Sequence, residues 1–310
     1  MSTNPSPLKL SGRLGIQLYT MNAELNADLP GTLKSLHDIG YREVETASLH
    51  DLTPEQFRAE LDKAGLACRS CHLSLDPHVP QAGSFFSNQS SLDDPPAVIR
   101  RMKALGATQA VAASFPFLQK LLQRPDVNEL FADMERFGQV YGEIANALSA
   151  EDWVGIAHQL NDAAIALAPE GIRVSYHNHS TEFRKFANGQ NALEVLLANS
   201  DPDLVSLELD VGWSVVAGVD PVEFLKRHHG RVTQLHLKDT GPVGAGADLH
   251  IAPTEVGQGI MPWTELMKAV RSSPIQHVYV EQEPPFPSSA MESVRIAHAF
   301  LEPLMARLDV

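Results

Sequence analysis

The stretch Val205–Asp239 decides the fold; it reads VSLELDVGWSVVAGVDPVEFLKRHHGRVTQLHLKD. It opens with the apolar run Val205–Asp210 and closes around another, Thr233–Leu237, and both carry the leucine and β-branched residues of buried strands. Between them, Asp220-Pro221 marks a helix start, because aspartate caps a helix and proline fits its first turn. The stretch therefore predicts a strand–helix–strand unit with parallel strands.

The same unit recurs from one end of the chain to the other. Its helical stretches have apolar residues three or four positions apart, as in Val154, Ala157 and Leu160. Eight apolar runs alternate with these stretches, and each predicts a strand. They are Leu14–Tyr19, Glu43–Ala47, Ala67–Leu73, Gln109–Ala113, Arg173–His177, Val205–Asp210, Thr233–Leu237 and Val278–Glu281.

Eight strands, each followed by a helix, predict a closed (β/α)8 TIM barrel. We expect a single domain over residues 1–310, with residues 1–12 as its N-terminal tail, because no linker rich in glycine, serine or proline divides the chain. A doubly wound sheet is the alternative. That fold needs a phosphate-binding glycine loop after its first strand, and the sequence has none there.

Two connections are longer than barrel loops usually are, Phe115–Ala150 (residues 115–150) and Thr240–Met261 (residues 240–261). They contain most of the about 60 residues by which the chain exceeds a typical barrel of about 250. The first has apolar residues in helical spacing, which predicts an added helix. Two roles stay open for it: a roof over the barrel mouth, or a packing surface that would support a homo-oligomer.

Composition excludes several classes of protein. The chain has 24 Lys and Arg against 38 Asp and Glu, so its net charge is −14, which opposes binding to nucleic acid or to an anionic membrane. No apolar run approaches the roughly 20 residues that span a bilayer. The 2 cysteines and the lack of an apolar segment in the first ten residues predict a cytoplasmic protein. The negative net charge favours a small neutral ligand or a cation as its binding partner.

Polar residues gather where four consecutive strands end, which is where parallel barrels carry their active sites. Side chains alternate along a strand, so His177 shares a face with His179, Glu208 with Asp210, and Glu281 with Glu283. One aspartate, one glutamate and one or two imidazoles suit Mn²⁺, Co²⁺, Zn²⁺ or Fe²⁺. The four segments are Tyr176-His177-Asn178-His179, Leu207-Glu208-Leu209-Asp210, Leu235-His236-Leu237-Lys238-Asp239 and Val280-Glu281-Gln282-Glu283.

At these residues the chain resembles the xylose-isomerase-like barrel superfamily of sugar phosphate isomerases/epimerases. Its members include sugar 3-epimerases, hydroxypyruvate isomerase, inosose dehydratase and endonuclease IV. The resemblance covers nearly the whole chain and is specific for the superfamily, without singling out a reaction. Besides the strand ends above, it rests on Gly15-Ile16-Gln17-Leu18-Tyr19, Glu182-Phe183, Val211-Gly212-Trp213 and Glu255-Val256-Gly257-Gln258-Gly259.

The resemblance implies a divalent metal ion held by Asp210, His236 and Glu281. The family's fourth ligand is a glutamate at the end of the fifth strand, where this sequence has His177. Either His177 ligates as a neutral imidazole, or Glu182 supplies the missing carboxylate. In the epimerases the two metal-binding glutamates form the acid/base pair, so the change to His177 leaves only Glu281 and argues against a symmetric epimerase mechanism.

Two enzymatic hypotheses follow, both beginning with a metal ion that polarises a carbonyl and stabilises an enediolate. The first is an isomerase or epimerase of a small sugar or keto-sugar. The second is a lyase or hydratase, such as a dehydratase or a keto-glycoside-cleaving enzyme, with Glu281 as base and His179 or Lys238 as acid. A non-catalytic sugar-binding protein is the third hypothesis. A nuclease would need a basic groove, which the net charge of −14 opposes.

Four further residues are candidates for substrate contact. His72 and Glu45 end strands and face the cup, Trp213 offers an apolar wall, and Glu255 lies beside glycines in a loop that can close over substrate. Each has a structural alternative, as hydrogen-bonded filler or as core. No arginine cluster is evident, which favours a non-phosphorylated sugar, a keto-sugar, an inositol derivative or a keto-glycoside over a sugar phosphate.

Overall fold

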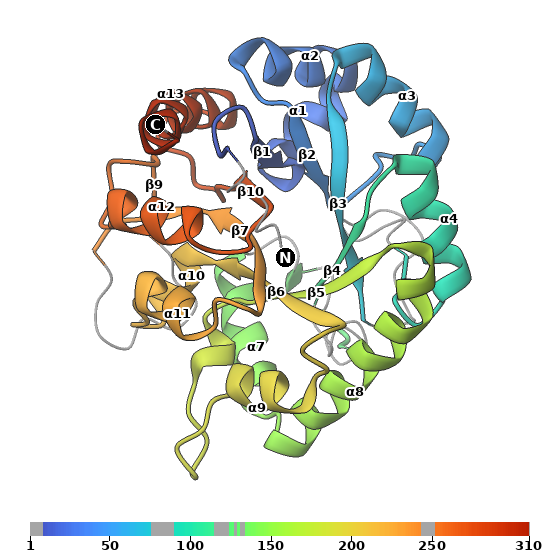
Figure 1. Ribbon diagram of the computed structural model, residues 1–310, viewed down its shortest axis with the longest axis vertical. Helices are drawn as coiled ribbons and strands as arrows, with labels where there is room; N and C mark the ends of the chain where they lie inside the picture. Colours follow the sequence, from blue (N-terminus) through green and yellow to red (C-terminus); the bar gives the residue numbers. More distant parts are fainter. Residues whose placement is uncertain are drawn as a thin grey trace, which may run out of the picture.

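The structure is a computed structural model that describes residues 9–75, 90–114, 124–126, 129–130, 134–242 and 252–309. Within these residues eight parallel strands close into a barrel in the order β1-β10-β7-β6-β5-β4-β3-β2, and helices surround it (Figure 1). The (β/α)8 prediction is confirmed. The strands are β1 (Leu14–Gln17), β2 (Glu43–Thr46), β3 (Ala67–Ser74), β4 (Gln109–Ser114), β5 (Arg173–His177), β6 (Val205–Asp210), β7 (Val232–Leu237) and β10 (His277–Val280).

The helices start where the sequence places capping residues. Thr53 accepts a hydrogen bond from the backbone N–H of Gln56 at the start of α3, and Asp220 caps α11 in the same way. The helices are α1 (Asn22–Ala27), α2 (Leu29–Ile39), α3 (Pro54–Ala64), α4 (Pro95–Leu105), α7 (Met134–Asn146), α8 (Ala150–Leu167), α9 (Ala192–Asn199), α10 (Val211–Val216), α11 (Pro221–Arg227), α12 (Trp263–Arg271) and α13 (Ala290–Leu308), with 3-10 turns η1 (Leu18–Met21), η2 (Ala168–Glu170) and η3 (Thr181–Phe183).

Strand β1 ends two residues earlier than the sequence predicts. The side-chain oxygen of Gln17 accepts a hydrogen bond from the backbone N–H of Tyr19 at 3.1 Å, and this contact turns the chain into η1. The predicted boundaries of β5 and β6 agree with the structure, and β7 and β10 each begin one residue early. The early end of β1 leaves the Gln17 side chain inside the barrel, beside Glu45.

Helix α7 is the added helix predicted in residues 115–150, although 115–123, 127–128 and 131–133 lie outside the described residues. It packs against η3, which follows β5, so it lies toward the end of the barrel where the strands finish. In the second long connection, residues 243–251 are not described, and β8 (Asp239–Thr240) pairs with β9 (Pro253–Thr254). Residues 1–8 of the predicted tail are also outside the described part.

Asp239 fastens the end of the second connection to β7. Its carboxylate accepts hydrogen bonds from the backbone N–H groups of Gly257, Gly259 and Met261 and from the indole N–H of Trp263, at 2.9 to 3.2 Å. Gly259 has no room for a side chain, because a Cβ atom there would lie 2.2 Å from an Asp239 oxygen. Asp239 therefore stabilises the fold, while its neighbour Lys238 enters the barrel.

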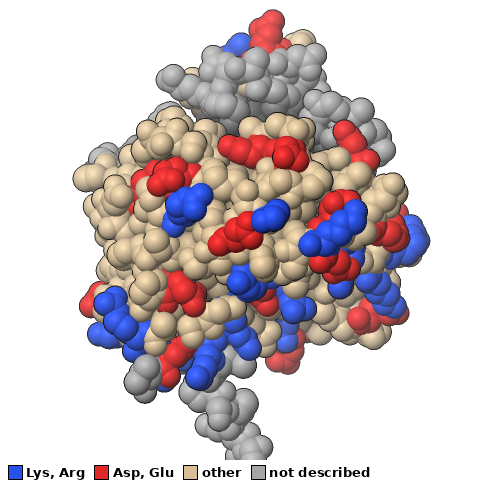
Figure 2. Space-filling model, turned by 90° about the horizontal axis from the view of Figure 1, so that it is seen from above, with Lys and Arg blue, Asp and Glu red and all other residues tan. Residues whose placement is uncertain are grey.

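The apolar core lies between the strands and the helices, whereas the C-terminal half of the barrel interior is polar. On the face drawn in Figure 2, acidic and basic side chains are interleaved over much of the surface. No helix in the described part of the chain is long and apolar enough to cross a membrane.

Candidate functional site

Asp210 is the most firmly positioned residue of the site. It ends β6 and caps α10, with Oδ1 accepting a hydrogen bond from the Trp213 N–H at 2.9 Å. The side chain of Asn178 accepts from the Asp210 N–H at 3.1 Å and donates to its carbonyl at 3.4 Å. The other carboxylate oxygen, Oδ2, is buried and accepts no hydrogen bond within the described part of the chain, and burial raises the pKa of the group. Asp210 thus holds one carboxylate oxygen in the interior whose close partner there is an ion pair with Lys238 Nζ.

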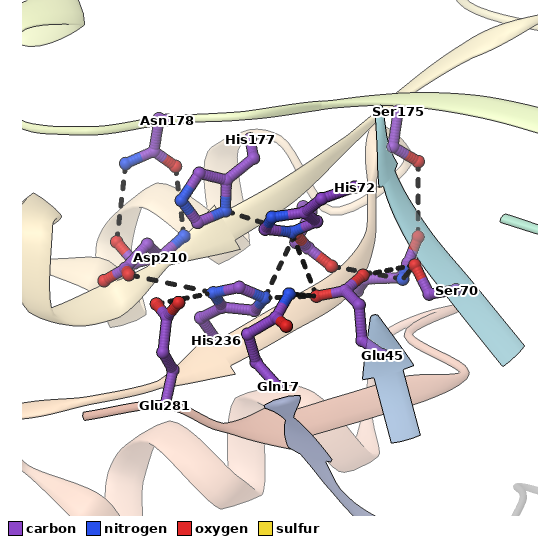
Figure 3. Close-up of polar contacts among 12 residues, drawn as sticks. Gln17, Glu45, Ser70, His72, Ser175, His177, Asn178, Asp210, His236 and Glu281 are labelled. Atoms are coloured by element: carbon purple, nitrogen blue, oxygen red, sulfur yellow. Dashed lines mark hydrogen bonds and ion pairs between the residues drawn. The ribbon is translucent and has the colours of Figure 1, made fainter. Parts of the chain in front are cut away.

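Three further side chains lie close to Asp210, and we refer to the four residues together as the ligand group. His177, Asp210, His236 and Glu281 are all buried, and one ligand atom of each lies within 4.8 Å of those of the other three. The Nδ1 atom of His236 is 2.9 Å from Glu281 Oε2 and 4.0 Å from Asp210 Oδ2 (Figure 3). The group brings together the four metal-ligand candidates of the sequence, and it can hold a divalent cation.

Lys238, which directly follows β7, lies beside the ligand group. Its Nζ lies 3.0 Å from Asp210 Oδ2, 2.9 Å from Glu281 Oε2 and 2.6 Å from Glu283 Oε1. It also lies 5.1 Å from the centre of a Trp213 ring, a cation–π distance. Burial lowers the pKa of Lys238, but the three carboxylates outweigh burial and hold it well above the ordinary value. The site therefore keeps a charged ammonium beside its carboxylates.

A second polar cluster lies against the imidazoles of the ligand group; we refer to Glu45, His72 and Glu208 as the deep layer. His72 Nε2 lies 3.0 Å from Glu45 Oε1 and 2.9 Å from Glu208 Oε2. Gln17 donates to Glu45 at 2.8 Å, and Gln234 donates to Glu208 at 3.1 Å. His72 and Glu45 therefore lie inside the barrel, against the imidazoles of the ligand group.

Glu208 and Gln17 are site residues that the sequence reasoning did not select. Alternation along β6 places Glu208 on the same face as Asp210, and that signal was available. His72, His177, Glu208 and His236 also form a buried set that could hold a metal ion, and this set shares two imidazoles with the ligand group.

The charges of the two layers are coupled. Burial and the charge of Glu45 raise the pKa of Glu208 to about 7. Burial lowers the pKa of His72, but Glu45 and Glu208 outweigh it and raise the value to about 9. Burial also lowers the pKa of His236, but Glu208 and Glu281 outweigh burial and hold the value well above the ordinary one. His177 behaves oppositely: burial and the positive charge of His236 hold its pKa well below normal.

Glu182 lies outside the ligand group. Its carboxylate accepts hydrogen bonds from the Tyr176 hydroxyl at 2.8 Å, the His179 backbone N–H at 3.0 Å and the Thr181 hydroxyl at 2.9 Å. The ring of His179 lies 4.9 Å from that of His177 and 5.8 Å from that of Trp213. Glu182 thus shapes the turn that carries His179, which flanks the ligand group.

Trp213 and Glu255 are both buried. Trp213 contacts Lys238 and His179, and its indole N–H has no hydrogen-bond partner in the described part of the chain. Glu255 accepts a hydrogen bond from the Ser293 hydroxyl on α13 at 2.9 Å, and its other oxygen has no such partner there. The structure therefore joins Trp213 to the ligand group and Glu255 to α13.

Comparisons with known proteins agree with the barrel fold. The family model described as xylose isomerase-like TIM barrel matches residues 33–304. An inosose dehydratase of Geobacillus kaustophilus is 24% identical over 228 residues, which are 69% of this chain and 66% of that protein. This chain therefore covers slightly less than two thirds of that relative's length.

Two solved structures show the same fold. A sugar phosphate isomerase/epimerase from Parabacteroides distasonis superposes with a TM-score of 0.68 at 23% identity, over 98% of this chain and 97% of that one. The IolI protein with a bound zinc atom superposes with a TM-score of 0.65 at 15% identity, over 95% and 98% of the two chains. At these identities the likeness establishes the barrel and no reaction.

Proposed function

Because the chain belongs to the xylose isomerase-like TIM barrel family, we propose that its ligand group binds one divalent cation, Mn²⁺, Co²⁺, Zn²⁺ or Fe²⁺. The donor set supports this, since two carboxylates and two imidazoles suit a borderline metal. So does Asp210 Oδ2, a buried oxygen that accepts no hydrogen bond. Glu182 is engaged with its own turn, which favours His177 as the fourth ligand.

We propose that the protein is a metal-dependent lyase that dehydrates a small keto-sugar or keto-polyol. The observation that carries this proposal is the asymmetry of the site: the fourth ligand position holds His177, so Glu281 is the one glutamate among the four ligand candidates, and it lies 2.9 Å from the Lys238 ammonium. An elimination needs one base and one acid of different kinds, whereas an epimerase needs two equivalent groups on opposite faces.

In the proposed reaction, each of these residues has one role. When bound, the cation polarises the substrate carbonyl and stabilises the negative charge that develops as the neighbouring proton leaves. Glu281 accepts that proton as an ionised carboxylate: burial raises its pKa, but Lys238 and His236 outweigh burial and hold the value well below normal. His179 donates a proton to the β-hydroxyl, whose C–O bond breaks to release water as the carbon–carbon double bond forms. Lys238, held charged, binds a substrate oxygen.

A sugar isomerase is the second candidate. Glu281 and Lys238 lie 2.9 Å apart, so a proton taken by Glu281 can return from the same side to the neighbouring carbon. Such a transfer needs no second carboxylate, so His177 does not oppose it. The inosose dehydratase relative favours the lyase over this alternative.

The test is a screen of keto-sugars, inositol-derived ketones and keto-glycosides with the metal-loaded protein in D2O, read by mass. A product lighter by one water supports the lyase, and an isomer that carries deuterium supports the second candidate. The Asp210→Asn variant is the background control. A loaded protein that binds these compounds but converts none of them is a sugar-binding protein, and this outcome overturns both enzymatic proposals.

A further inference from the structure

In each imidazole of the ligand group, one ring nitrogen faces a carboxylate of the deep layer. On His236, Nδ1 faces Glu281 at 2.9 Å, and Nε2 lies 2.6 Å from Glu45 Oε1 and 3.2 Å from Glu208 Oε2. On His177, Nδ1 lies 3.1 Å from Glu208 Oε2, and Figure 3 shows the other nitrogen turned toward Asp210. Both rings thus lie between a ligand-group carboxylate and a deep-layer carboxylate.

An imidazole that binds a metal through one nitrogen carries its proton on the other. A carboxylate that accepts this outer N–H fixes the tautomer, orients the ring and strengthens the ligand. By this rule His236 binds through Nδ1 while Nε2–H donates to Glu45. His177 binds through Nε2 while Nδ1–H donates to Glu208.

The two outer carboxylates are themselves held rigidly. His72 Nε2 bridges Glu45 and Glu208, and its ring stacks on that of His236 at 5.3 Å with an interplanar angle of 14°. Neutral side chains also donate to these carboxylates: Gln17 and Ser70 donate to Glu45, and Gln234 donates to Glu208. Because these donors come from three different strands, the deep layer is set by the barrel itself.

We propose that Glu208 and Glu45 are positioning residues, which hold His177 and His236 in their metal-binding tautomers, and that His72 locks the two carboxylates in place. The inference rests on the proposed metal site. The inference also assigns a role to the other possible metal-binding set, His72, His177, Glu208 and His236. This set shares His177 and His236 with the ligand group, and by the inference it supports one metal ion and does not form a second site.

Matched variants test the roles. Glu208→Gln keeps an acceptor oxygen but loses the charge, and Glu208→Met loses both; Glu45→Gln and Glu45→Met form the parallel pair. The control is Glu43→Gln, which removes the carboxylate of a glutamate–histidine pair of the same length at the other end of the barrel, where Glu43 Oε2 lies 2.9 Å from His277 Nδ1. The readouts are metal affinity and stoichiometry, the visible spectrum of the Co²⁺-loaded protein, and ¹⁵N NMR of the imidazoles.

We expect one ion per wild-type chain and an affinity about 10–100-fold lower in the methionine variants, the range typical for loss of an outer partner. The glutamine variants should fall between wild type and methionine, and the Co²⁺ spectrum should shift only in deep-layer variants. Equal affinities and spectra in Glu208→Met and wild type overturn the inference. So does a second ion in the wild type that is lost in His72→Asn.

The NMR measurement separates this inference from the proposed function. In the metal-free wild type, neutral His177 should carry its proton on Nδ1, and this preference should disappear in Glu208→Met. A proton found on Nε2 overturns the inference whether or not metal binds. A wild type that binds no metal, by contrast, overturns the proposed function, and the tautomer of His177 still decides whether Glu208 orients it.

Discussion

Two histidine–glutamate pairs with the same geometry lie at opposite ends of this barrel. His236 Nδ1 is 2.9 Å from Glu281 Oε2 where the strands end, and His277 Nδ1 is 2.9 Å from Glu43 Oε2 where they begin. The first pair is almost completely buried, with 0% and 6% of the side chains exposed. The second keeps 13% and 16% exposed and is joined by Arg69 at 3.2 Å.

The difference between the pairs lies in their surroundings. Around His236 and Glu281, Asp210 Oδ2 is left without a hydrogen bond, although Lys238 is close by. Around Glu43, by contrast, His277 and Arg69 each satisfy one carboxylate oxygen. A paired histidine and glutamate are therefore compatible with a purely structural role, and the functional signal is the buried Asp210 oxygen, which has an ion pair with Lys238 but no hydrogen bond in the described residues.

The largest effect should come from Asp210→Asn. Asparagine can still cap α10, so the fold is retained, but the charged oxygen at the centre of the ligand group is lost. We expect metal affinity to fall by more than about 100-fold, beyond the loss typical of an outer partner, and turnover to be abolished. Metal titration and thermal melting of Asp210→Asn beside Glu43→Gln measure this. If Asp210→Asn binds metal with wild-type affinity, the Asp210 oxygen does not distinguish the His236–Glu281 pair from the His277–Glu43 pair.

Lys238→Met should separate metal binding from turnover. The ammonium competes for the two carboxylates that the metal needs, so its loss should leave metal affinity equal to or higher than that of the wild type. Turnover should fall about 10²–10³-fold, the range typical when a donor that stabilises a substrate oxygen is removed. Steady-state kinetics on the metal-loaded variant measure the second effect. Lower affinity with normal turnover would show that Lys238 acts only as structural support.

Metal affinity should rise with pH. In the metal-free protein, burial lowers the pKa of His236, but Glu208 and Glu281 outweigh it and hold the value well above normal, so His236 is protonated near neutrality. Binding through Nδ1 must release that proton, so affinity should rise about tenfold per pH unit below this pKa. Calorimetry in buffers of different ionisation heat counts the proton. Affinity that stays constant between about pH 6 and pH 8 would contradict a protonated His236.

The smallest effect should come from Glu43→Gln. Burial raises the pKa of Glu43, but His277 and Arg69 outweigh it, so the folded value lies below the unfolded one. The pair therefore stabilises the fold above the unfolded pKa, and this contribution is lost as pH falls through the folded pKa. We expect a loss of about 0.2–1 kcal/mol at pH 7 that shrinks in acid, measured by urea unfolding. Any change in metal affinity would break the contrast between the two ends.

The sequence predicts the barrel because strand and helix signals are local. Buried parallel strands have continuous apolar runs, and the capping residues Thr53 and Asp220 mark helix starts with little dependence on tertiary context. The end of β1 was missed because it depends on one side chain, Gln17, bonding to the next turn. The loops of residues 115–123 and 243–251 lie outside the described residues, so their predicted place over the mouth stays a prediction.

The site was predictable where one rule applies, namely that polar strand ends face one cup. That rule marked the strand ends that hold His177, Asp210, His236 and Glu281, and the family resemblance selected these four as ligand candidates; the structure brings them together. Alternation gives the face of a residue but not its partners, so Glu45 and His72 were taken for substrate contacts and Glu208 was not selected. Nor could it foresee Glu255 bonding to α13, a contact set by helix packing distant in sequence.

The most direct test of the central claim, one cation held by the ligand group, is elemental analysis of the purified chain after reconstitution with Mn²⁺, Co²⁺, Zn²⁺ and Fe²⁺ in turn. The account predicts one tightly held ion per chain for the wild type and for Glu43→Gln, and a nearly metal-free Asp210→Asn that remains folded. A wild type that retains none of the four metals, or an Asp210→Asn variant with wild-type metal content, would contradict it.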